Sequence, residues 1–133
     1  MKRAQIIIIS KCPYDLNKTN RQEIIKKINP LPYQKVFFTT IDYNECLVGK
    51  NNIMINDLID SPILLVTGIA DSSELEKYLN KKKIIFDHLR FDDHHNYSQK
   101  DINLIKSKSI GKKVVTTKKD YYKIIAIESI KNI

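Results

Sequence analysis

The feature that most constrains this chain is an alternation of short apolar, β-branched segments with segments of helical character. The segments predicted as strands are 6–9, 35–40, 62–67, 84–91 and 114–117. A predicted helix follows most of them, the last starting at Lys118. Such alternation is typical of βαβ units, in which each crossover helix packs on a mainly parallel sheet. We therefore expect one α/β domain over residues 1–133, with a mainly parallel sheet flanked by helices in three layers.

Local patterns predict where the helices begin and which strands are buried. The predicted N-caps are Thr19 or Asn20, Ser72 or Ser73 (with Ser73-x-x-Glu76 as a capping box), Ser98 and Thr117. Asn29-Pro30 should end the first helix. The continuous apolar run Ile6–Ile9 is expected to be covered on both faces. Residues 41–61 fit either a hairpin, pairing 46–48 with 53–55, or a loop that joins two halves.

Composition bounds the class of protein. The longest apolar run is strand-sized, so neither a membrane span nor a secretory leader is expected, and we place the chain in the cytoplasm. Cys12 and Cys46 are expected to be free thiols there. The net charge of +8 comes from lysines spread along the chain, with Arg3, Arg21 and Arg90 as the arginines. Readers of nucleic acid favour arginine and interleaved aromatic residues, so no nucleic-acid partner is expected; attraction to an anionic membrane fits the charge.

Ligands of parallel sheets gather beyond the carboxyl ends of the strands. Four polar segments are expected at that edge: 10–13, 67–70, 92–96 and 116–120. Functional residues are therefore expected in these segments.

The most informative of them is Asp92-Asp93-His94-His95, held between a strand end and the helix capped by Ser98. An aspartate can fix an imidazole in one tautomer and raise its pKa, which suits proton transfer or contact with phosphate. Local capping and plain exposure would explain the same residues without a function. A metal site is a further alternative, although adjacent histidines cannot easily face one ion together.

Two weaker candidates flank this cluster. Thr117 can cap the last helix with Asp120 three residues later, and Lys119 beside that helix N-terminus could help to hold a phosphate. Gly68 allows a tight turn or the close approach of a ligand at a strand end. The chain contains neither G-x-x-x-x-G-K-[ST] nor G-x-G-x-x-G, so it has no evident phosphate-binding loop for ATP.

Taken together in this order, three segments resemble the C-terminal half of the tetraacyldisaccharide 4'-kinase family. They are Pro62-Ile-Leu-Leu-Val-Thr-Gly-Ile-Ala70, Phe91-Asp-Asp-His-His-Asn-Tyr-Ser98 with Asp101, and Val114-Val-Thr-Thr-Lys-Lys-Asp120. Ile6 to Pro13, an apolar strand ending in Ser-Lys-Cys-Pro, fits the preceding stretch of the family. Lys118 departs from the pattern, since the family usually has glutamate there. Met1 stands where family sequences are already under way, so we expect a shortened chain or a split gene.

The resemblance implies a P-loop-kinase-like fold and a role in lipid A biosynthesis in a Gram-negative bacterium. The whole enzyme would transfer the γ-phosphate of ATP, with Mg²⁺, to the 4'-hydroxyl of a tetraacyldisaccharide 1-phosphate, at the cytoplasmic face of the inner membrane. The phosphate loop, the Mg²⁺ ligands and the catalytic aspartate would belong to an absent N-terminal half, which would be the chain's partner. His94, oriented by Asp93, would reach the active site, with His95, Thr117, Lys119, Asp120 and Gly68 in the vicinity of substrate or phosphate.

Two alternatives from other classes stay open at this point. One is a self-sufficient metal-dependent phosphoesterase that uses the cluster from Asp92 to His95. The other is a non-catalytic basic module that binds acidic partners through its lysines. On the leading hypothesis, this chain binds no nucleotide or metal by itself and is inactive alone.

Overall fold

The computed structural model of this protein describes residues 3–49 and 52–130. By its contacts the chain divides into two compact units, Met1–Asn44 and Glu45–Ile133, each of which is described by itself. We call them the N-terminal unit and the C-terminal unit. Sequence analysis expected one domain over residues 1–133, and the division falls within residues 41–61, for which a loop that joins two halves was one of the two alternatives.

The N-terminal unit is a single βαβ element. Strand β1 (Ile6–Ile9) pairs in parallel with β2 (Lys35–Phe38), and helix α1 (Lys18–Ile28) connects them. The helix N-cap is Asn17, whose side chain accepts a hydrogen bond from the backbone N–H of Asn20, so the predicted caps at Thr19 and Asn20 were wrong. Because the helix begins at Lys18, Thr19 and Asn20 lie inside its first turn and cannot serve as its N-cap. Asn29, with φ of 47°, ends the helix as predicted.

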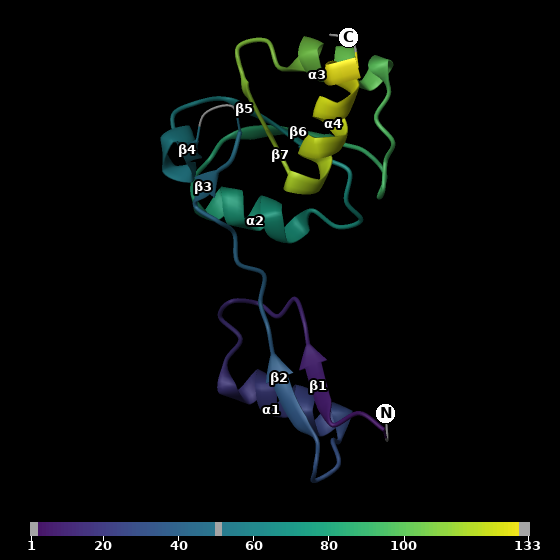
Figure 1. The fold of residues 1–133 in the computed structure, drawn as a ribbon. Helices are drawn as coiled ribbons and strands as arrows, with labels where there is room; N and C mark the ends of the chain where they lie inside the picture. The colour runs from purple at the N-terminus through teal and green to yellow at the C-terminus, as the bar shows by residue number, and fades with distance from the viewer. Residues whose placement is uncertain (1–2, 50–51, 131–133) are drawn as a thin grey trace. The chain divides into compact units, whose positions relative to one another are not determined.

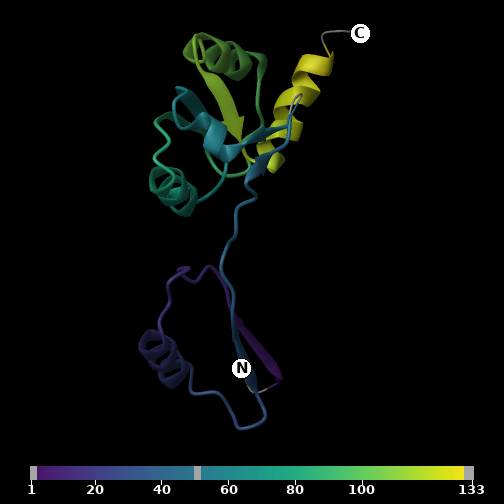
Figure 2. The same cartoon turned by 90° about the vertical axis from the view of Figure 1, so that its left-hand side faces the viewer.

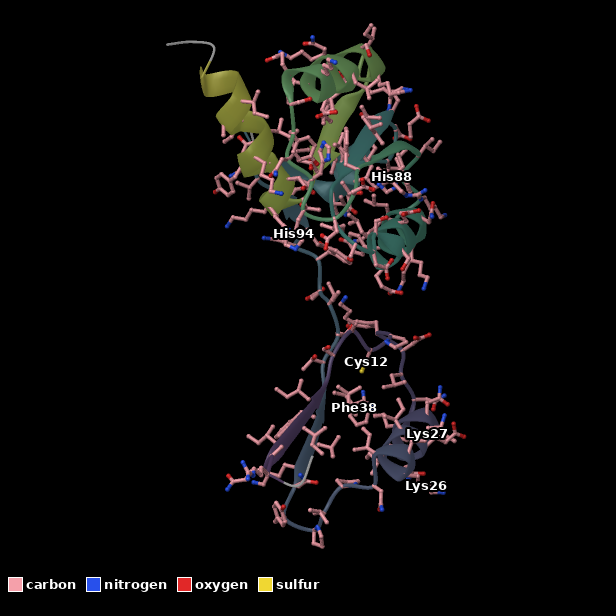
Figure 3. All side chains as sticks on the ribbon, turned by 90° about the vertical axis from the view of Figure 1, so that its right-hand side faces the viewer. Cys12, Lys26, Lys27, Phe38, His88 and His94 are labelled. Carbon is pink, nitrogen blue, oxygen red and sulfur yellow. The ribbon has the colours of Figure 1, made fainter. Side chains whose placement is uncertain are left out.

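The two faces of this strand pair are not equally covered. Figure 3 shows Phe38 between the strand pair and α1, where the Arg21 guanidinium lies 5.6 Å from its ring centre. On the opposite face Ile6 and Ile8 are 57% and 63% exposed. The expectation that Ile6–Ile9 is covered on both faces is therefore wrong for this unit, because one helix can cover only one face of a two-stranded sheet.

The C-terminal unit is built on a three-stranded parallel sheet of order β6-β5-β7 (Figure 1). Its elements in chain order are β3 (Cys46–Leu47), β4 (Ile53–Met54), the 3₁₀ helix η1 (Ile55–Leu58), β5 (Ile63–Thr67), α2 (Ser73–Lys81), β6 (Phe86–Arg90), α3 (Gln99–Lys108), β7 (Lys113–Thr116) and α4 (Lys118–Ile130). Strands β3 and β4 pair antiparallel, which confirms the hairpin alternative for this stretch. Residues 50 and 51 of the predicted turn lie outside the described residues.

The central strand β5 is buried along its whole length because both faces of the sheet are covered. On one face Ile63 and Leu65 pack with Leu79 of α2 and with η1. On the other face Leu64 and Val66 pack with α3 and with the apolar side of α4 (Figures 1 and 2). Sheet and helices thus form three layers in this unit. With the parallel pair of the N-terminal unit, this confirms the predicted α/β class.

The helix starts of the C-terminal unit test the capping predictions directly. Ser98 caps α3 and forms a capping box with Asp101, as predicted. Helix α2 begins after Ser72, and the Ser72 hydroxyl donates to the Glu76 carboxylate, so the predicted capping box from Ser73 is wrong. Within the described part of the chain no helix is both long enough and apolar enough to cross a membrane.

Candidate active site

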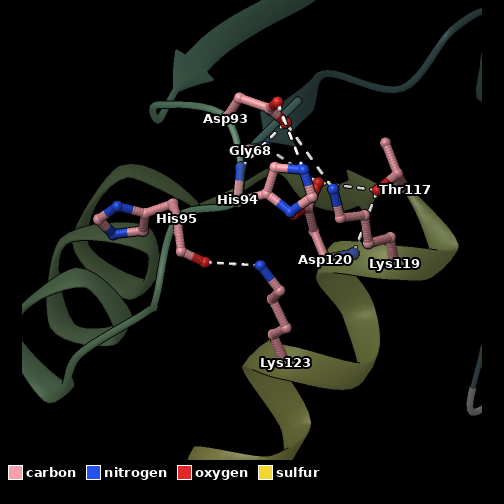
Figure 4. A network of polar contacts seen from close by, with 8 residues as sticks. All are labelled: Gly68, Asp93, His94, His95, Thr117, Lys119, Asp120 and Lys123. Carbon is pink, nitrogen blue, oxygen red and sulfur yellow. Dashed lines mark hydrogen bonds and ion pairs between the residues drawn. The ribbon is translucent and has the colours of Figure 1, made fainter. Parts of the chain in front are cut away.

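Three of the four predicted edge segments meet at the carboxyl end of the C-terminal sheet. The backbone N–H of Gly68, just after β5, donates to Oδ2 of Asp120 in the first turn of α4, at 2.9 Å. The N–H of Phe91, just after β6, donates to the Thr67 carbonyl at 2.8 Å. The segments that follow β5 and β6 and the first turn of α4 are therefore joined by direct hydrogen bonds, of which Figure 4 shows the one between Gly68 and Asp120.

Asp120 is the centre of this junction and is fully buried. Its Oδ2 also accepts the Thr117 hydroxyl at 2.7 Å, and its own N–H donates to Thr117 Oγ1 at 3.1 Å. This reciprocal pattern confirms the predicted cap at Thr117, and the carboxylate sits at the positive end of the helix, where it is favoured. Asp120 thereby joins the first turn of α4 to the end of β5 through Oδ2.

Gly68 is required by close packing around it. A methyl group on Gly68 would lie 3.0 Å from Asp120 Oδ1 and 3.1 Å from the Tyr97 hydroxyl oxygen. Tyr97 is itself buried, and both this burial and the Asp120 carboxylate raise the pKa of its phenol, so Tyr97 stays neutral. The glycine at this position thus allows two buried polar side chains to approach the end of β5.

The segment after β6 forms a tight turn. The N–H of His95 donates to the Asp92 carbonyl at 3.1 Å, and the N–H of His94 donates to Asp93 Oδ1 at 2.9 Å. His94 has φ of 58°, in the left-handed region that side chains other than glycine rarely adopt. Such backbone conformations persist where the surroundings hold them, and they concentrate at functional sites.

The turn presents one imidazole to the outside. The His94 side chain is 76% exposed, and its Nε2 lies 3.5 Å from Asp93 Oδ2. Lys119 Nζ lies 3.7 Å from the other oxygen of Asp93, so this carboxylate stands between two nitrogen groups (Figure 4). The structure thus brings Asp93 and His94 of the loop after β6 together with Lys119 of the first turn of α4, which precedes the buried Asp120.

His95 is placed differently from its neighbour. Its ring stacks on Phe91 with centroids 4.7 Å apart, and its Nε2 lies 3.2 Å from Asp101 Oδ2 in the capping box of α3. The Lys123 ammonium donates to the His95 carbonyl at 2.8 Å. A hydrogen bond from Ser98 and the adjacent His95 lower the pKa of Asp101. His95 therefore fixes the loop to α3, and Lys123 fixes it to α4, while His94 points elsewhere.

This geometry bears on the metal-dependent alternative. The four side chains from Asp92 to His95 do not converge, since His94 contacts Asp93 whereas His95 contacts Asp101. Across residues 3–49 and 52–130, no group of three or more His, Cys, Asp or Glu side chains is placed to hold a metal ion. The cluster thus offers no ligand set for the phosphoesterase hypothesis.

Sequence analysis missed a second polar group on the α2 side of the sheet. His88 of β6 is almost wholly buried; its Nε2 lies 2.8 Å from Thr67 Oγ1 and its Nδ1 lies 3.3 Å from Glu76 Oε1. Glu76 in turn accepts from Ser72 and Arg90. Burial lowers the pKa of His88 below its ordinary value of 6.5. The available signal was a histidine in the middle of a predicted strand.

The fourth predicted segment, Ser10 to Pro13, belongs to the N-terminal unit and follows β1 there. Cys12 donates its S–H to the carbonyl of Ile9, the last residue of β1, at 3.2 Å. Both Cys12 and Cys46 are free thiols, as predicted.

Comparison with known proteins shows which family this chain resembles. A family model described as tetraacyldisaccharide-1-P 4'-kinase matches residues 1–133. Curated relatives named tetraacyldisaccharide 4'-kinase include those of Bacteroides thetaiotaomicron, 35% identical over 92% of this chain, and Flavobacterium johnsoniae, 35% identical over 92%. The relative from Bacteroides fragilis is 33% identical over 96% of the chain.

These matches cover only part of each relative. The chain spans 37% of the Bacteroides thetaiotaomicron protein, 36% of the Flavobacterium johnsoniae protein and 37% of the Bacteroides fragilis protein. No solved structure matches the chain significantly.

Proposed function

Because this chain belongs to the tetraacyldisaccharide-1-P 4'-kinase family, we propose that it is the C-terminal portion of a lipid A 4'-kinase. The complete enzyme transfers the γ-phosphate of ATP to the 4'-hydroxyl of a tetraacyldisaccharide 1-phosphate. The observation that carries this proposal is the family match over residues 1–133, in a chain whose three family-like segments meet at one sheet edge.

His94 is the residue of this chain that we assign to the chemistry. It is exposed at the edge where ligands of parallel sheets gather, and Asp93 lies within reach of its ring. An imidazole in this setting can hold or move a proton at Nε2, or tune the group that accepts the proton of the substrate hydroxyl. Lys119 adds positive charge beside Asp93, which suits a site that handles phosphate.

We propose that Mg²⁺ and the nucleotide phosphates are not bound by the residues described here. These residues contain no group of acidic or imidazole side chains placed to hold a metal ion, and the sequence has no phosphate-binding loop. We therefore assign ATP and Mg²⁺ to the remainder of the enzyme. When bound, Mg²⁺ neutralises the charge that develops on the transferred phosphoryl group, and positioning supplies much of the rest of catalysis.

The test is a reconstitution. This chain alone should give no transfer of phosphate from ATP to a tetraacyldisaccharide 1-phosphate, and transfer should appear when the missing portion is supplied in the same polypeptide. His94→Ala in that reconstituted enzyme should lower kcat by about 10²-fold, since loss of a positioned acid–base group typically costs that much.

Asn96→Ala is the matched control for His94→Ala, because Asn96 lies in the same loop and is exposed. It should leave kcat unchanged. If His94→Ala and Asn96→Ala behave alike in an active reconstituted enzyme, the assignment of His94 is wrong. If no reconstituted enzyme transfers phosphate, the kinase proposal itself fails.

We further propose that the enzyme works at the cytoplasmic face of the inner membrane, where its lipid substrate is available. The net charge of +8 supports attraction to an anionic surface. Sedimentation with vesicles of phosphatidylglycerol should capture the chain at low ionic strength and release it at about 0.5 M salt, because exposed charges are then screened. Capture that persists at high salt, or no capture at all, would argue against this placement.

A further inference from the structure

Helix α4 packs on the sheet of the C-terminal unit through one side only. Asp120, Ile124 and Ile127 follow one another at the i, i+4, i+7 spacing of a single helix face. Asp120 on this face is fully buried, and the two isoleucines pack against the buried cluster that contains Leu64 and Val66. The opposite side of α4 therefore faces away from the sheet.

This opposite side combines aromatic and aliphatic side chains with a lysine. Lys118, Tyr122 and Ile125 repeat the i, i+4, i+7 spacing about half a turn away from the buried face. Tyr122 is 57% exposed, Lys118 is exposed and Ile125 is partly exposed. The ring of Tyr121, which is also partly exposed, lies 5.7 Å from the ring of Tyr122. We call Lys118, Tyr121, Tyr122 and Ile125 the outer face of α4.

The exposed charges of this part of α4 have one sign. Within residues 118–127 the only acidic residue is Asp120, which is buried. The ammonium group of Lys123 is turned toward the loop after β6, where it donates to a backbone carbonyl (Figure 4). The other lysines of the stretch, Lys118 and Lys119, are exposed in its first turn. The outer face therefore presents positive charge at one end and apolar side chains along the rest.

The surface of an anionic bilayer matches this combination. Acidic headgroups attract lysines, and tyrosine rings settle at the boundary between headgroups and acyl chains with the hydroxyl in contact with water. An aliphatic side chain beside them can enter the edge of the acyl region. The outer face runs for about 10 Å along the helix from Lys118 to Ile125, at about 1.5 Å per residue. A helix lying along the membrane surface would bring all of it into contact.

We propose that the outer face of α4 is the surface through which this chain contacts an anionic bilayer. This rests on the proposed function, since it takes the substrate to be an acylated disaccharide held in a membrane. Helix α4 begins at the carboxyl edge of the sheet, and Lys119 in its first turn lies 3.7 Å from Asp93, the neighbour of His94. Contact through the outer face therefore brings the candidate site close to the headgroups, where the substrate hydroxyl lies.

The first test uses a fluorescent reporter on the outer face. The chain contains no tryptophan, so Tyr122→Trp supplies a single one. With vesicles of phosphatidylglycerol at low ionic strength, its emission should move to shorter wavelength, and vesicles with brominated acyl chains should quench it. Tyr33→Trp is the matched control, because Tyr33 of the N-terminal unit is 56% exposed, and its emission should not change. Quenching of Tyr122→Trp that is absent, or no stronger than that of the control, would overturn the proposal.

The second test measures sedimentation with the same vesicles. Tyr122→Ser should weaken binding about tenfold through the loss of buried ring surface. Lys118→Gln should weaken it about fivefold, the effect of about 1 kcal/mol per lysine at an anionic surface. Tyr33→Ser and Lys83→Gln remove the same groups from exposed positions elsewhere and should change binding by less than about twofold. Circular dichroism checks that the helices survive. Equal effects of outer-face and control substitutions would show that another surface binds the membrane.

Two other occupants of the outer face are outcomes of the reporter experiment. A blue shift of Tyr122→Trp that grows with chain concentration in the absence of vesicles would mean that a second copy covers the face. The same shift on addition of the rest of the Bacteroides thetaiotaomicron 4'-kinase would mean that protein covers it. Either result would overturn the proposal.

Both tests measure membrane contact without ATP, so they separate this proposal from the kinase assignment. Quenching of Tyr122→Trp, with no phosphate transfer by the reconstituted enzyme, would refute the kinase assignment alone. Phosphate transfer without quenching would refute the outer face alone. A chain that binds no vesicles at all would refute the outer face together with the placement at the membrane.

Discussion

Replacement of the buried Asp120 carboxylate tests whether the candidate site is held by the Gly68–Asp120–Thr117 junction. In Asp120→Ala the Gly68 N–H, 2.9 Å from Oδ2, and the Thr117 hydroxyl, 2.7 Å from it, both lose their acceptor. Hydrogen bonds to a charged group contribute about 1.5–3 kcal/mol each. Part of this is offset, because the wild-type carboxylate is itself buried at a cost. We therefore expect Asp120→Ala to lower the free energy of unfolding by about 3 kcal/mol.

Asp120→Asn separates the hydrogen bonds from the charge. The amide oxygen of the new side chain can accept the hydrogen bonds from Gly68 and Thr117 that Oδ2 accepts in the wild type. The free energy of unfolding should therefore fall by only about 1 kcal/mol. Urea unfolding followed by circular dichroism measures both, since α2, α3 and α4 belong to the C-terminal unit. Asp60→Ala, at an exposed aspartate of the same unit, should change stability by less than about 0.5 kcal/mol. The reasoning is refuted if Asp120→Ala costs less than about 1 kcal/mol, or if Asn is as damaging as Ala.

Three further predictions concern the elements around this junction. Ser98→Ala removes the cap of α3 and should cost about 1 kcal/mol in urea unfolding, where an unchanged midpoint would contradict the capping box. Gly68→Ala should lower the free energy of unfolding by about 1–3 kcal/mol, because the new methyl group would lie 3.0 Å from Asp120 Oδ1. Wild-type stability of this variant would show that the residues around Gly68 can move to make room for the methyl group. His88 has a pKa lowered by burial, so the unfolded chain takes up its proton first, and stability should fall as pH drops from about 6.5 through the lower pKa of the folded state. His88→Gln should flatten that part of the stability–pH profile, and an equally steep profile would show that other groups cause it.

Local patterns were sufficient where one short segment determines the outcome. Ser98 and Asp101 form the predicted capping box because both partners lie within one helical turn. The same holds for Thr117 and Asp120. The strand Pro62–Thr67 was recognisable because a continuous apolar run fits burial on both faces, and β5 is indeed buried throughout.

Sequence patterns did not predict the structure where several neighbouring residues could each cap the same helix. They also did not predict contacts between residues that are far apart in the sequence. Asn17, Thr19 and Asn20 are all good caps, and only the structure shows that α1 starts after Asn17. The burial of Asp120 against Gly68, 52 residues away, depends on the order β6-β5-β7, which spacing alone does not give. For the same reason the sequence could not show that His95 packs on Phe91 while His94 is exposed.

The contrast between the two histidines is the strongest structural argument about the site. Hydrogen bonds hold the turn at three points. They join Phe91 to the end of β5, the His95 ring to α3, and the His95 carbonyl to α4. A turn held at so many points has no need of a left-handed histidine for stability, since glycine or asparagine would adopt φ of 58° at lower cost. His94 nevertheless occupies that position with its ring 76% exposed. His94 thus combines a left-handed backbone conformation with an exposed imidazole at the ligand edge of the sheet, which is the arrangement expected if, as we propose, this residue takes part in the chemistry.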